Sequence, residues 1–564
     1  MPARRLPEAA EAGGARVRFT FDGRRYEGIE GEPVAVSLLA AGRLTLSRSF
    51  RFHRPRGLMC STGECGWCEC EVEGRPSVRT CRVRLRDGMA VRGEHAWPSV
   101  EHDLLRALDL GSRLVPPTFY HHRFLRPRRL RKAYLDVLRW FGGRGRLRRG
   151  MPMDWHVPRA LQRDEADVLV VGGGRAGLLA AIGAADGGGR VVVLEADAEI
   201  DPDLRDLVTQ ARSLGVDVRL GTMATGWYGG MVTAMDDSSL WEIRAGAVIS
   251  ATGTYDLVPG VPGADRPGVM SARLVGRLLA RDGVLPAERV ILVGQGQESE
   301  SVAVALAEAG ARVIGPIATA SLSGIGGRGP VSWVRYQDPQ GARVTTRERV
   351  DLVVFGDRTP NLDLVLAAGA AVGWEDGRID AQVAADGRTT VAGLFLVGDG
   401  RELSHRNGPS DQEVGRAAAA HARRTRENVA SGEVGGGPTP TIRAGNPARS
   451  PARGLAPARG PAGAMVCFCE DVRGWEIEAE LAAGYSDPEL VKRRTGALTG
   501  PCQGKYCLVA VTCAMSGLEA TDRDQTVVLP TGRPPLRPIR LGDLVVADGS
   551  IEPIAPTPAP DMVP

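Results

Sequence analysis

Lysine is almost absent from this chain. Only three of its 71 basic residues are lysine, namely Lys132, Lys492 and Lys505, and the formal net charge is only +4 over 564 residues. Nucleic-acid binders cluster positive charge on one module, whereas here only residues 121–149 are notably basic. A docking face or a solvated helix explains that stretch, so we expect no nucleic-acid partner.

Long apolar segments are missing as well. No run of 18 apolar residues is present, and the first 20 residues contain no apolar core of the kind that a secretion signal requires. These absences predict a cytoplasmic protein without a transmembrane segment. Cysteine is sparse, with ten residues in 564, which excludes a disulfide scaffold and is typical of thiols that serve as ligands in a reducing compartment.

Eight of the ten cysteines form two quartets near opposite ends of the chain. The first quartet has the spacing Cys-x4-Cys-x2-Cys-x12-Cys, which is typical of plant-type 2Fe-2S clusters. A zinc ribbon is the alternative, but zinc sites favour two short Cys pairs a dozen or more residues apart. The expected cluster ligands are Cys60, Cys65, Cys68 and Cys81. The leftover Cys70 and Cys513 are expected to be core residues.

The second quartet has the spacing Cys-x-Cys-x32-Cys-x4-Cys. Its last two members precede or open an apolar helix that starts at 508–511, and the N-terminal end of a helix favours an anionic cluster. Zinc is a stronger rival here because the spacing is less distinctive. We interpret these residues as ligands of a second 2Fe-2S cluster: Cys467, Cys469, Cys502 and Cys507.

A nucleotide fingerprint lies between the quartets. The sequence Gly-Gly-Gly-Arg-Ala-Gly at 172–177 follows an apolar strand at 168–171 and opens a helix at 178–185. In such fingerprints the glycines allow the tight turn, the approach of the pyrophosphate and close helix packing, and the residues expected in these roles are Gly172, Gly174 and Gly177. Glu195 ends the next strand and would bind a ribose diol, which argues against a 2'-phosphate.

Later turns add weaker candidates. Residues 251–253 and 397–400 lie where folds of this kind return to the dinucleotide, so Gly253 and Asp399 are further candidates, although each turn alone could be an ordinary strand end. A second fingerprint at 294–299 is followed by a strand that offers neither an acid for a ribose nor a base for a 2'-phosphate, so we expect a degenerate unit there. No hydrolytic triad is apparent, and no catalytic residue is assigned.

The order of these patterns predicts an α+β multidomain protein. The expected parts are an N-terminal β-grasp-like 2Fe-2S ferredoxin domain, a central α/β flavoprotein fold with two dinucleotide units, and a small helical 2Fe-2S domain near the C-terminus. The predicted boundaries are 1–95 for the first domain, 96–160 for a connector, 161–432 for the central fold with its nested unit at about 287–375, 433–464 for a flexible linker, 465–520 for the helical domain and 521–564 for a Pro-rich tail.

Four motifs together resemble one family. They lie at 52–57, 99–105, 116–120 and 533–535, and they are similar to the alpha subunit of heterotetrameric sarcosine oxidase. Because it has cysteines at both ends, the chain more closely resembles the large electron-transfer subunits of hydrogen cyanide synthase, opine oxidase and proline or hydroxyproline dehydrogenases. The C-terminal unit resembles the bacterioferritin-associated ferredoxin (BFD) domain, whose ligands correspond to the second quartet.

The resemblance implies a heteromeric enzyme. A separate FAD-containing beta subunit of the D-amino-acid-oxidase type would oxidise the substrate, a small gamma subunit would complete the complex, and the large subunit would pass electrons to a quinone, a cytochrome or oxygen. An FMN would lie at the subunit interface, near Lys492, 493–495 and 503–505, with Lys505 as a candidate phosphate contact. Exposed helix charges are the alternative for this region.

Two departures from the family pattern limit what it implies. The alpha subunit of sarcosine oxidase continues into a large folate-binding domain, whereas this sequence stops at residue 564, so folate-linked chemistry is not expected. A Gly-Gly loop is also missing after Glu195, so the central site is expected to hold an ADP-containing ligand that is FAD, NAD or ATP.

The resulting hypothesis is an electron-transfer subunit of a flavin-dependent amine or imino acid dehydrogenase or oxidase, of the sarcosine, proline, hydroxyproline or opine type. Two alternatives stay open. One is a self-contained NAD(P)H-dependent flavin and iron–sulfur reductase, and the other is a non-redox scaffold.

Overall fold

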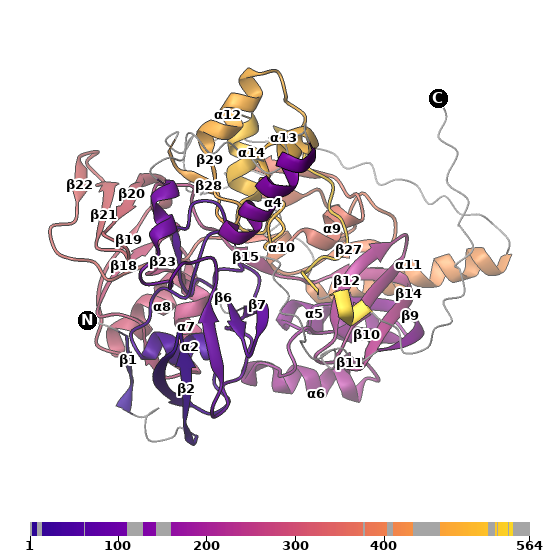
Figure 1. Cartoon of the computed structure of the whole chain (residues 1–564). Coiled ribbons are helices and arrows are strands. Elements are labelled where there is room, and N and C mark those ends of the chain that lie inside the picture. Colours follow the sequence, from indigo (N-terminus) through magenta and orange to yellow (C-terminus); the bar gives the residue numbers. More distant parts are fainter. Residues whose placement is uncertain are drawn as a thin grey trace.

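The computed structural model describes residues 3–7, 14–60, 62–109, 128–142, 159–375, 378–402, 410–431, 463–516, 525–526, 528–539 and 541–544. The described elements form an N-terminal sheet domain, a central body with two larger sheets and several smaller ones, and a helical unit above them (Figure 1). No helix in these ranges has both the length and the apolar character needed to cross a bilayer.

The N-terminal domain is a five-stranded sheet with the order β3-β2-β8-β6-β7. Helix α2 (Val34–Ala40) packs on it through a buried apolar face. β2 and β8 run parallel, whereas the other pairs are antiparallel. The strands are β2 (Arg16–Phe21), β3 (Arg24–Ile29), β6 (Glu69–Val72), β7 (Arg75–Arg79) and β8 (Ala90–Gly93). This mixed arrangement matches the expected β-grasp-like fold.

Residues before this sheet reach another part of the molecule. β1 (Arg4–Arg5) pairs antiparallel with β17 (Val284–Leu285) of the central body. The N-terminal domain is therefore tied to the central body from its first described residues. Within the expected connector, the structure describes the 3-10 turn η1 (Leu104–Asp109) and helix α4 (Arg128–Gly142).

The first central unit is built on a seven-stranded sheet. Its parallel core is β11-β10-β9-β14, and β27 pairs with β14. Helices α5 (Arg175–Asp186) and α11 (Asp411–Ser431) pack against this sheet, and α6 (Arg205–Ser213) packs on α5. The strands are β9 (Ala160–Val171), β10 (Val191–Leu194), β11 (Asp217–Arg219), β12 (Met223–Tyr228), β13 (Met231–Met235), β14 (Ser239–Ser250) and β27 (Leu394–Leu396).

The second central unit has a parallel sheet with the order β16-β23-β18-β19. These strands are β16 (Val269–Ser271), β18 (Arg289–Val293), β19 (Arg312–Ile317) and β23 (Leu352–Phe355), accompanied by helices α7 (Ala272–Ala280) and α8 (Gln297–Glu308). An antiparallel sheet extends from it through β20 (Leu322–Gly326), β21 (Trp333–Gln337) and β22 (Arg343–Thr345). The nested arrangement predicted for the central fold is present.

Short elements connect the two units. They are β15 (Thr254–Asp256) paired with β24 (Arg358–Pro360), helices α9 (Asp363–Ala367) and α10 (Asp399–Glu402), and the three-stranded sheet of β25 (Val372–Glu375), β26 (Arg378–Ala381) and β30 (Gln525–Thr526). Because β30 belongs to the tail, the chain returns to the central body after the helical unit.

The C-terminal unit consists of a hairpin and three helices. They are β28 (Met465–Cys467), β29 (Val472–Arg473), α12 (Gly474–Ala482), α13 (Pro488–Thr495) and α14 (Leu508–Ser516). The side chain of Asp487 accepts a hydrogen bond from the backbone N of Leu490, and Gly496 ends α13 with φ of 78°. The sequence itself predicts both ends, because Asp followed by Pro is typical of a helix N-cap and first position, and Gly is typical of the residue that stops a helix. Most of the predicted linker 433–464 lies outside the described residues.

A buried network of arginines and carboxylates holds the three parts together. Arg56 binds Asp265 of the central body at 2.6 Å and Asp471 of the helical unit at 2.7 Å, while Arg54 binds Asp265 at 2.6 Å. Arg51 forms an ion pair with Glu476. Burial opposes ionisation of Asp265, but Arg54 and Arg56 hold its pKa well below the ordinary value. The motif at 52–57 is thus an interdomain contact.

Candidate functional site

The four cysteines of the second quartet face one another in a closed ring. Cys469 Sγ lies 3.3 Å from Cys502 Sγ, and Cys507 Sγ lies 3.6 Å from Cys467 Sγ. Hydrogen-bond contacts also join Cys467 with Cys469 and Cys502 with Cys507. All four are free thiols, and only Cys469 is partly exposed. The hairpin β28-β29 supplies one side of the ring and the turn before α14 supplies the other.

The first quartet is also assembled and buried. Cys60 contacts Cys65, and Cys68 contacts Cys81, while charge interactions connect Cys60 to the other three. The hydrogen bond from Cys65 lowers the pKa of Cys60, whereas burial raises the pKa of Cys65. The four thiols are therefore close enough to interact with one another, as the ligands of a single site must be. Outside the quartets, Cys70 and Cys513 lie in apolar clusters, as expected.

The donor chemistry of both quartets fits iron–sulfur clusters. Each quartet offers four sulfur atoms from free thiols and no oxygen or nitrogen ligand, and thiolates are the usual ligands of 2Fe-2S clusters. In the part of the chain that the structure describes, no group of three or more His, Cys, Asp or Glu side chains is placed so that it could hold a single metal ion. The assignment of both quartets as cluster ligands stays a prediction.

The two quartets lie side by side, although they are at opposite ends of the sequence. Trp67 of the first loop meets Phe468 of the second site edge to face, with ring centroids 5.6 Å apart. Gly66 has φ of 72°, and a Cβ at this position would lie 3.1 Å from Pro501 Cγ. Arg79 donates a hydrogen bond to the carbonyl oxygen of Pro501 at 3.1 Å. The two loops are thus in direct contact.

Tyr506 connects both quartets with a pair of pockets. It immediately precedes Cys507, and the nearby charges of Cys60 and Cys65 add to burial in raising its pKa. Its ring centroid is 6.3 Å from that of Tyr255. Tyr255 lines both pockets. No sequence pattern indicated this aromatic pair.

The first pocket, of about 260 Å³, is the candidate nucleotide site. Four residues that were predicted as nucleotide contacts line it, namely Gly172, Gly174, Glu195 and Gly253, and their binding role stays a prediction. The carboxylate of Glu195 accepts hydrogen bonds from the backbone N of the fingerprint's second glycine at 2.7 Å and from that of Asp197 at 2.8 Å. Glu195 is therefore held at the turn where a ribose would bind.

Two other predicted residues, one from the fingerprint and one from the turn at 397–400, do not line this pocket. Gly177 lies beneath it, where a Cβ would approach the carbonyl oxygen of Gly172 to 2.0 Å. Only glycine therefore allows the close packing that the fingerprint predicts. Asp399 lies in α10, and its carboxylate is 3.1 Å from Arg358. Its role as a nucleotide contact stays a prediction.

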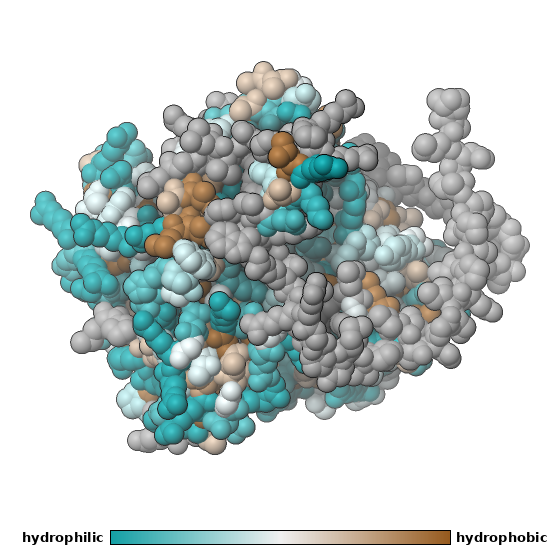
Figure 2. Space-filling view, in the orientation of Figure 1, coloured by the Kyte–Doolittle hydropathy of each residue, from teal (hydrophilic) through white to brown (hydrophobic). Residues whose placement is uncertain are grey.

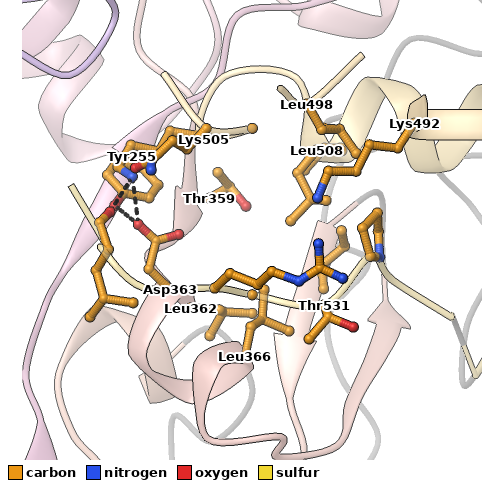
Figure 3. Close-up of a pocket in the computed structure, with 18 of the residues that line it drawn as sticks. Tyr255, Thr359, Leu362, Asp363, Leu366, Lys492, Leu498, Lys505, Leu508 and Thr531 are labelled. Atoms are coloured by element: carbon orange, nitrogen blue, oxygen red, sulfur yellow. Dashed lines mark hydrogen bonds and ion pairs between the residues drawn. The ribbon is translucent and has the colours of Figure 1, made fainter. Parts of the chain in front are cut away.

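The second pocket, of about 330 Å³, lies under the helical unit (Figure 3). Lys492 and Leu498 face it from one side, and Thr531 from the tail lines another. Lys505 has a buried side chain whose Nζ lies 2.8 Å from Asp363 Oδ2 and donates to a tail carbonyl oxygen at 2.7 Å. The positive charge of Lys505 is therefore already paired with a carboxylate, whereas a lysine that served only to bind a phosphate would need no such partner.

A shared wall separates the two pockets. Tyr255, Asp363 and Leu536 line both, and the hydroxyl of Tyr255 donates to Asp363 at 2.5 Å. Residues 530–537 of the Pro-rich tail complete this wall. The sequence predicted only a Pro-rich tail here and assigned none of its residues to a pocket, although the motif at 533–535 was an available indication.

The second fingerprint carries an acid at its turn. Asp357 follows β23, and its carboxylate contacts Thr319 and accepts a hydrogen bond from the backbone N of Gln295 at 3.3 Å. A Cβ on Gly294 would lie 2.7 Å from this carboxylate. A negative group in this position opposes a pyrophosphate, which supports the expectation of a degenerate unit.

Comparison with known proteins gives family matches in all three parts. Residues 14–96 match the 2Fe-2S iron-sulfur cluster binding domain, residues 167–201 match the FAD binding domain, and residues 462–548 match the Sarcosine oxidase A3 domain. The expected fold class is confirmed.

Individual relatives agree with these matches. The chain is 29% identical over 534 residues to the alpha subunit of sarcosine oxidase from Rhizobium meliloti, a match that covers 86% of this chain but only 53% of that protein. It is 26% identical to an opine oxidase subunit of Agrobacterium tumefaciens, with 68% of this chain and 92% of that protein covered. The resemblance to these subunits is confirmed. Both relatives are named as oxidase subunits, which agrees with the expectation of an oxidoreductase.

A solved structure supports the same fold. The L-proline dehydrogenase from P. horikoshii aligns with a TM-score of 0.64 and 19% identity, covering 94% of this chain and 98% of that one. The chain spans about half the length of the sarcosine oxidase subunit that it matches.

Proposed function

We propose that this chain is the electron-transfer subunit of a heteromeric flavin-dependent dehydrogenase or oxidase that acts on the CH–NH group of an amine or imino acid. The observation that carries the proposal is the direct contact between the two cysteine loops through Trp67 and Phe468, beside a nucleotide pocket of the FAD-binding type. Flavins accept electron pairs and iron–sulfur clusters pass single electrons, so adjacent sites of both kinds suit a relay.

The proposed partners follow from the relatives. The matched proteins are named as subunits of sarcosine and opine oxidases. A FAD-containing beta subunit of the D-amino-acid-oxidase type would oxidise the substrate, with a small gamma subunit in the complex. A quinone, a cytochrome or oxygen would receive the electrons. The substrate belongs to the sarcosine, proline, hydroxyproline or opine class.

Each pocket has a proposed occupant. The first would hold FAD, NAD or ATP, with Glu195 accepting hydrogen bonds from the adenosine ribose. The second would hold FMN at the interface with the partner subunit. There Lys492, whose side chain is 18% exposed, offers a cation for the phosphate, while Lys505 and Asp363 fix the opposite wall.

In such a relay, the residues of this chain would hold the clusters and keep solvent away from them. The thiolates of the quartets would hold the clusters in a buried, water-poor contact zone. Trp67, Phe468 and Tyr506 fill the space between the quartets and the pocket wall, which excludes solvent from the path. The chain thereby keeps donor and acceptor sites at fixed separations.

The test is anaerobic purification of the chain together with the product of the neighbouring gene. We expect an associated flavoprotein that oxidises an amine or imino acid, about four irons per large subunit, and a dithionite-induced EPR signal. A large subunit without iron and sulfide would contradict the proposal. Bleaching of the isolated chain by NADH would instead favour the self-contained reductase. Asp357 argues against that alternative, because its carboxylate lies at the turn where the pyrophosphate of a nicotinamide dinucleotide would bind.

A further inference from the structure

An ion pair between a buried carboxylate and a guanidinium that is 35% exposed joins the first cysteine loop to the C-terminal tail. Glu64 lies between Cys60 and Cys65, and its Oε1 is 3.1 Å from Nη2 of Arg537. The Glu64 side chain is 6% exposed.

The same arginine belongs to the nucleotide pocket. Arg537 lines it together with the fingerprint glycines and Glu195. Among the described residues that line this pocket, Arg537 is the one cation, whereas Glu195 and Asp363 are acids. A dinucleotide or ATP brings a polyphosphate of at least two negative charges, and guanidinium groups bind such oxygens well.

We propose that Arg537 binds the phosphates of the nucleotide and, through its ion pair with Glu64, makes the first cluster sense whether the pocket is occupied. The inference deepens the proposed function and rests on it in one respect, since the first quartet must hold a cluster. Neither the fingerprint nor the cysteine spacing assigns a role to either residue.

The direction of the effect follows from charge. Reduction adds one electron to a cluster whose loop already contains the Glu64 carboxylate, and net charge is one of the properties that set a cluster potential. Phosphates that bind Arg537 partly neutralise its positive charge, so the negative charge of Glu64 is less well compensated. The phosphates also add negative charge near the cluster. Occupation therefore disfavours reduction, and by reciprocity the reduced protein binds the nucleotide more weakly by the same factor.

The experiment is an EPR-monitored redox titration of the full-length, anaerobically purified protein, with the second cluster as internal reference. Glu64→Gln removes the negative charge and is expected to favour reduction of the first cluster about threefold to tenfold, where tenfold corresponds to about 59 mV for one electron. Arg537→Gln is expected to shift the same equilibrium in the opposite direction and to lower the nucleotide content of the purified protein. Arg537→Lys, which keeps the charge, should retain most of the wild-type potential.

A matched control exists in the same interface. Arg82 follows the first quartet and lies 3.0 Å from Asp197, but both side chains are about half exposed, at 47% and 46%. Solvent screens such a pair, so Asp197→Asn should change neither potential. The inference is overturned if both Glu64→Gln and Arg537→Gln leave the first potential unchanged, if both clusters shift equally, or if Arg537→Gln keeps its full nucleotide content. Absence of any iron–sulfur signal in the wild-type protein would instead refute the proposed function.

Discussion

The indole ring of Trp67 and the phenyl ring of Phe468 meet edge to face with their centroids 5.6 Å apart. Each residue lies between two cysteines of its own quartet, at 65 and 68 and at 467 and 469. The pair therefore joins the two loops directly. An edge-to-face contact contributes about 0.5–1.5 kcal/mol beyond the area that it buries.

Trp67→Leu is expected to weaken this contact and to slow electron exchange between the clusters. In wild-type protein the adjacent reduced clusters should broaden each other's EPR signals, and the variant should reduce this interaction. Trp67→Phe keeps a ring and should retain most of it. Tyr228, which is 51% exposed, provides the control variant Tyr228→Leu. Equal spectra for the tryptophan and tyrosine variants would contradict the assignment.

Replacement of one ligand in each quartet should remove one cluster at a time. Cys65→Ser and Cys502→Ser are each expected to lower the iron content from about four to about two atoms per chain, because a 2Fe-2S cluster holds two irons. Cys513→Ala should leave the iron content unchanged, since that thiol is buried in an apolar cluster. Iron and sulfide analysis provides the measurement, and a normal iron content in either ligand variant would refute that quartet.

Alanine substitutions at two glycines of the fingerprint are expected to affect ligand binding and folding differently. A Cβ on Gly174 meets nothing within 4 Å, whereas one on Gly177 lies 2.0 Å from a backbone oxygen. Gly174→Ala should therefore fold normally but lose bound nucleotide, because its methyl group would occupy the approach of the pyrophosphate. Gly177→Ala should lower the melting temperature as well. Chromatography of the released nucleotide, with thermal unfolding, distinguishes these outcomes.

Arg56 is expected to be the most sensitive position of the interdomain network. Arg56→Ala leaves the carboxylates of Asp265 and Asp471 buried without their shared partner, and removing one member of a buried pair destabilises by about 3–5 kcal/mol. Arg312→Ala removes an exposed pair with Glu348 and should change stability by less than about 1 kcal/mol. Chemical denaturation measures both, and similar losses for the two variants would contradict a structural role for the network.

Acid should destabilise the protein partly through Asp265. The folded state depresses the pKa of this carboxyl group, so the unfolded chain binds its proton more readily. The stabilising contribution is complete above the unfolded pKa of about 3.9 and is lost as pH falls below it. Asp265→Asn should flatten the decline of the melting temperature between about pH 5 and pH 3, whereas Asp197→Asn should not. An unchanged decline in Asp265→Asn would exclude this carboxyl group as a contributor.

Local features of the fold were predictable because short-range chemistry determines them. The strand at 191–194, the Asp487 cap and the Gly496 helix end have the expected positions. Gly172 and Glu195 were likewise found because strand, turn, helix and acid follow one another closely in the sequence. Spacing alone was enough to group each quartet.

Relationships between distant segments could not be predicted in the same way. No periodicity indicates that Trp67 meets Phe468, because that contact depends on how separate domains pack. Arg537 lies in a segment that the sequence predicted only as a Pro-rich tail. Lys505 was expected to bind a phosphate, but a single sequence could not reveal that Asp363 lies 2.8 Å away.

Ion pairs of the arginines within residues 51–56 hold the ferredoxin-like domain against the central body and the helical unit. Strand β1 adds a second contact with the central body (Figure 1). The view in Figure 2 shows a mainly hydrophilic surface over this domain, with apolar groups in small scattered areas. Such a domain does not shuttle between docking positions as a tethered carrier would. The rate of electron transfer between the two clusters would then depend on the tunnelling distance and not on diffusion of a mobile domain. The viscosity of the medium should therefore leave that rate unaltered.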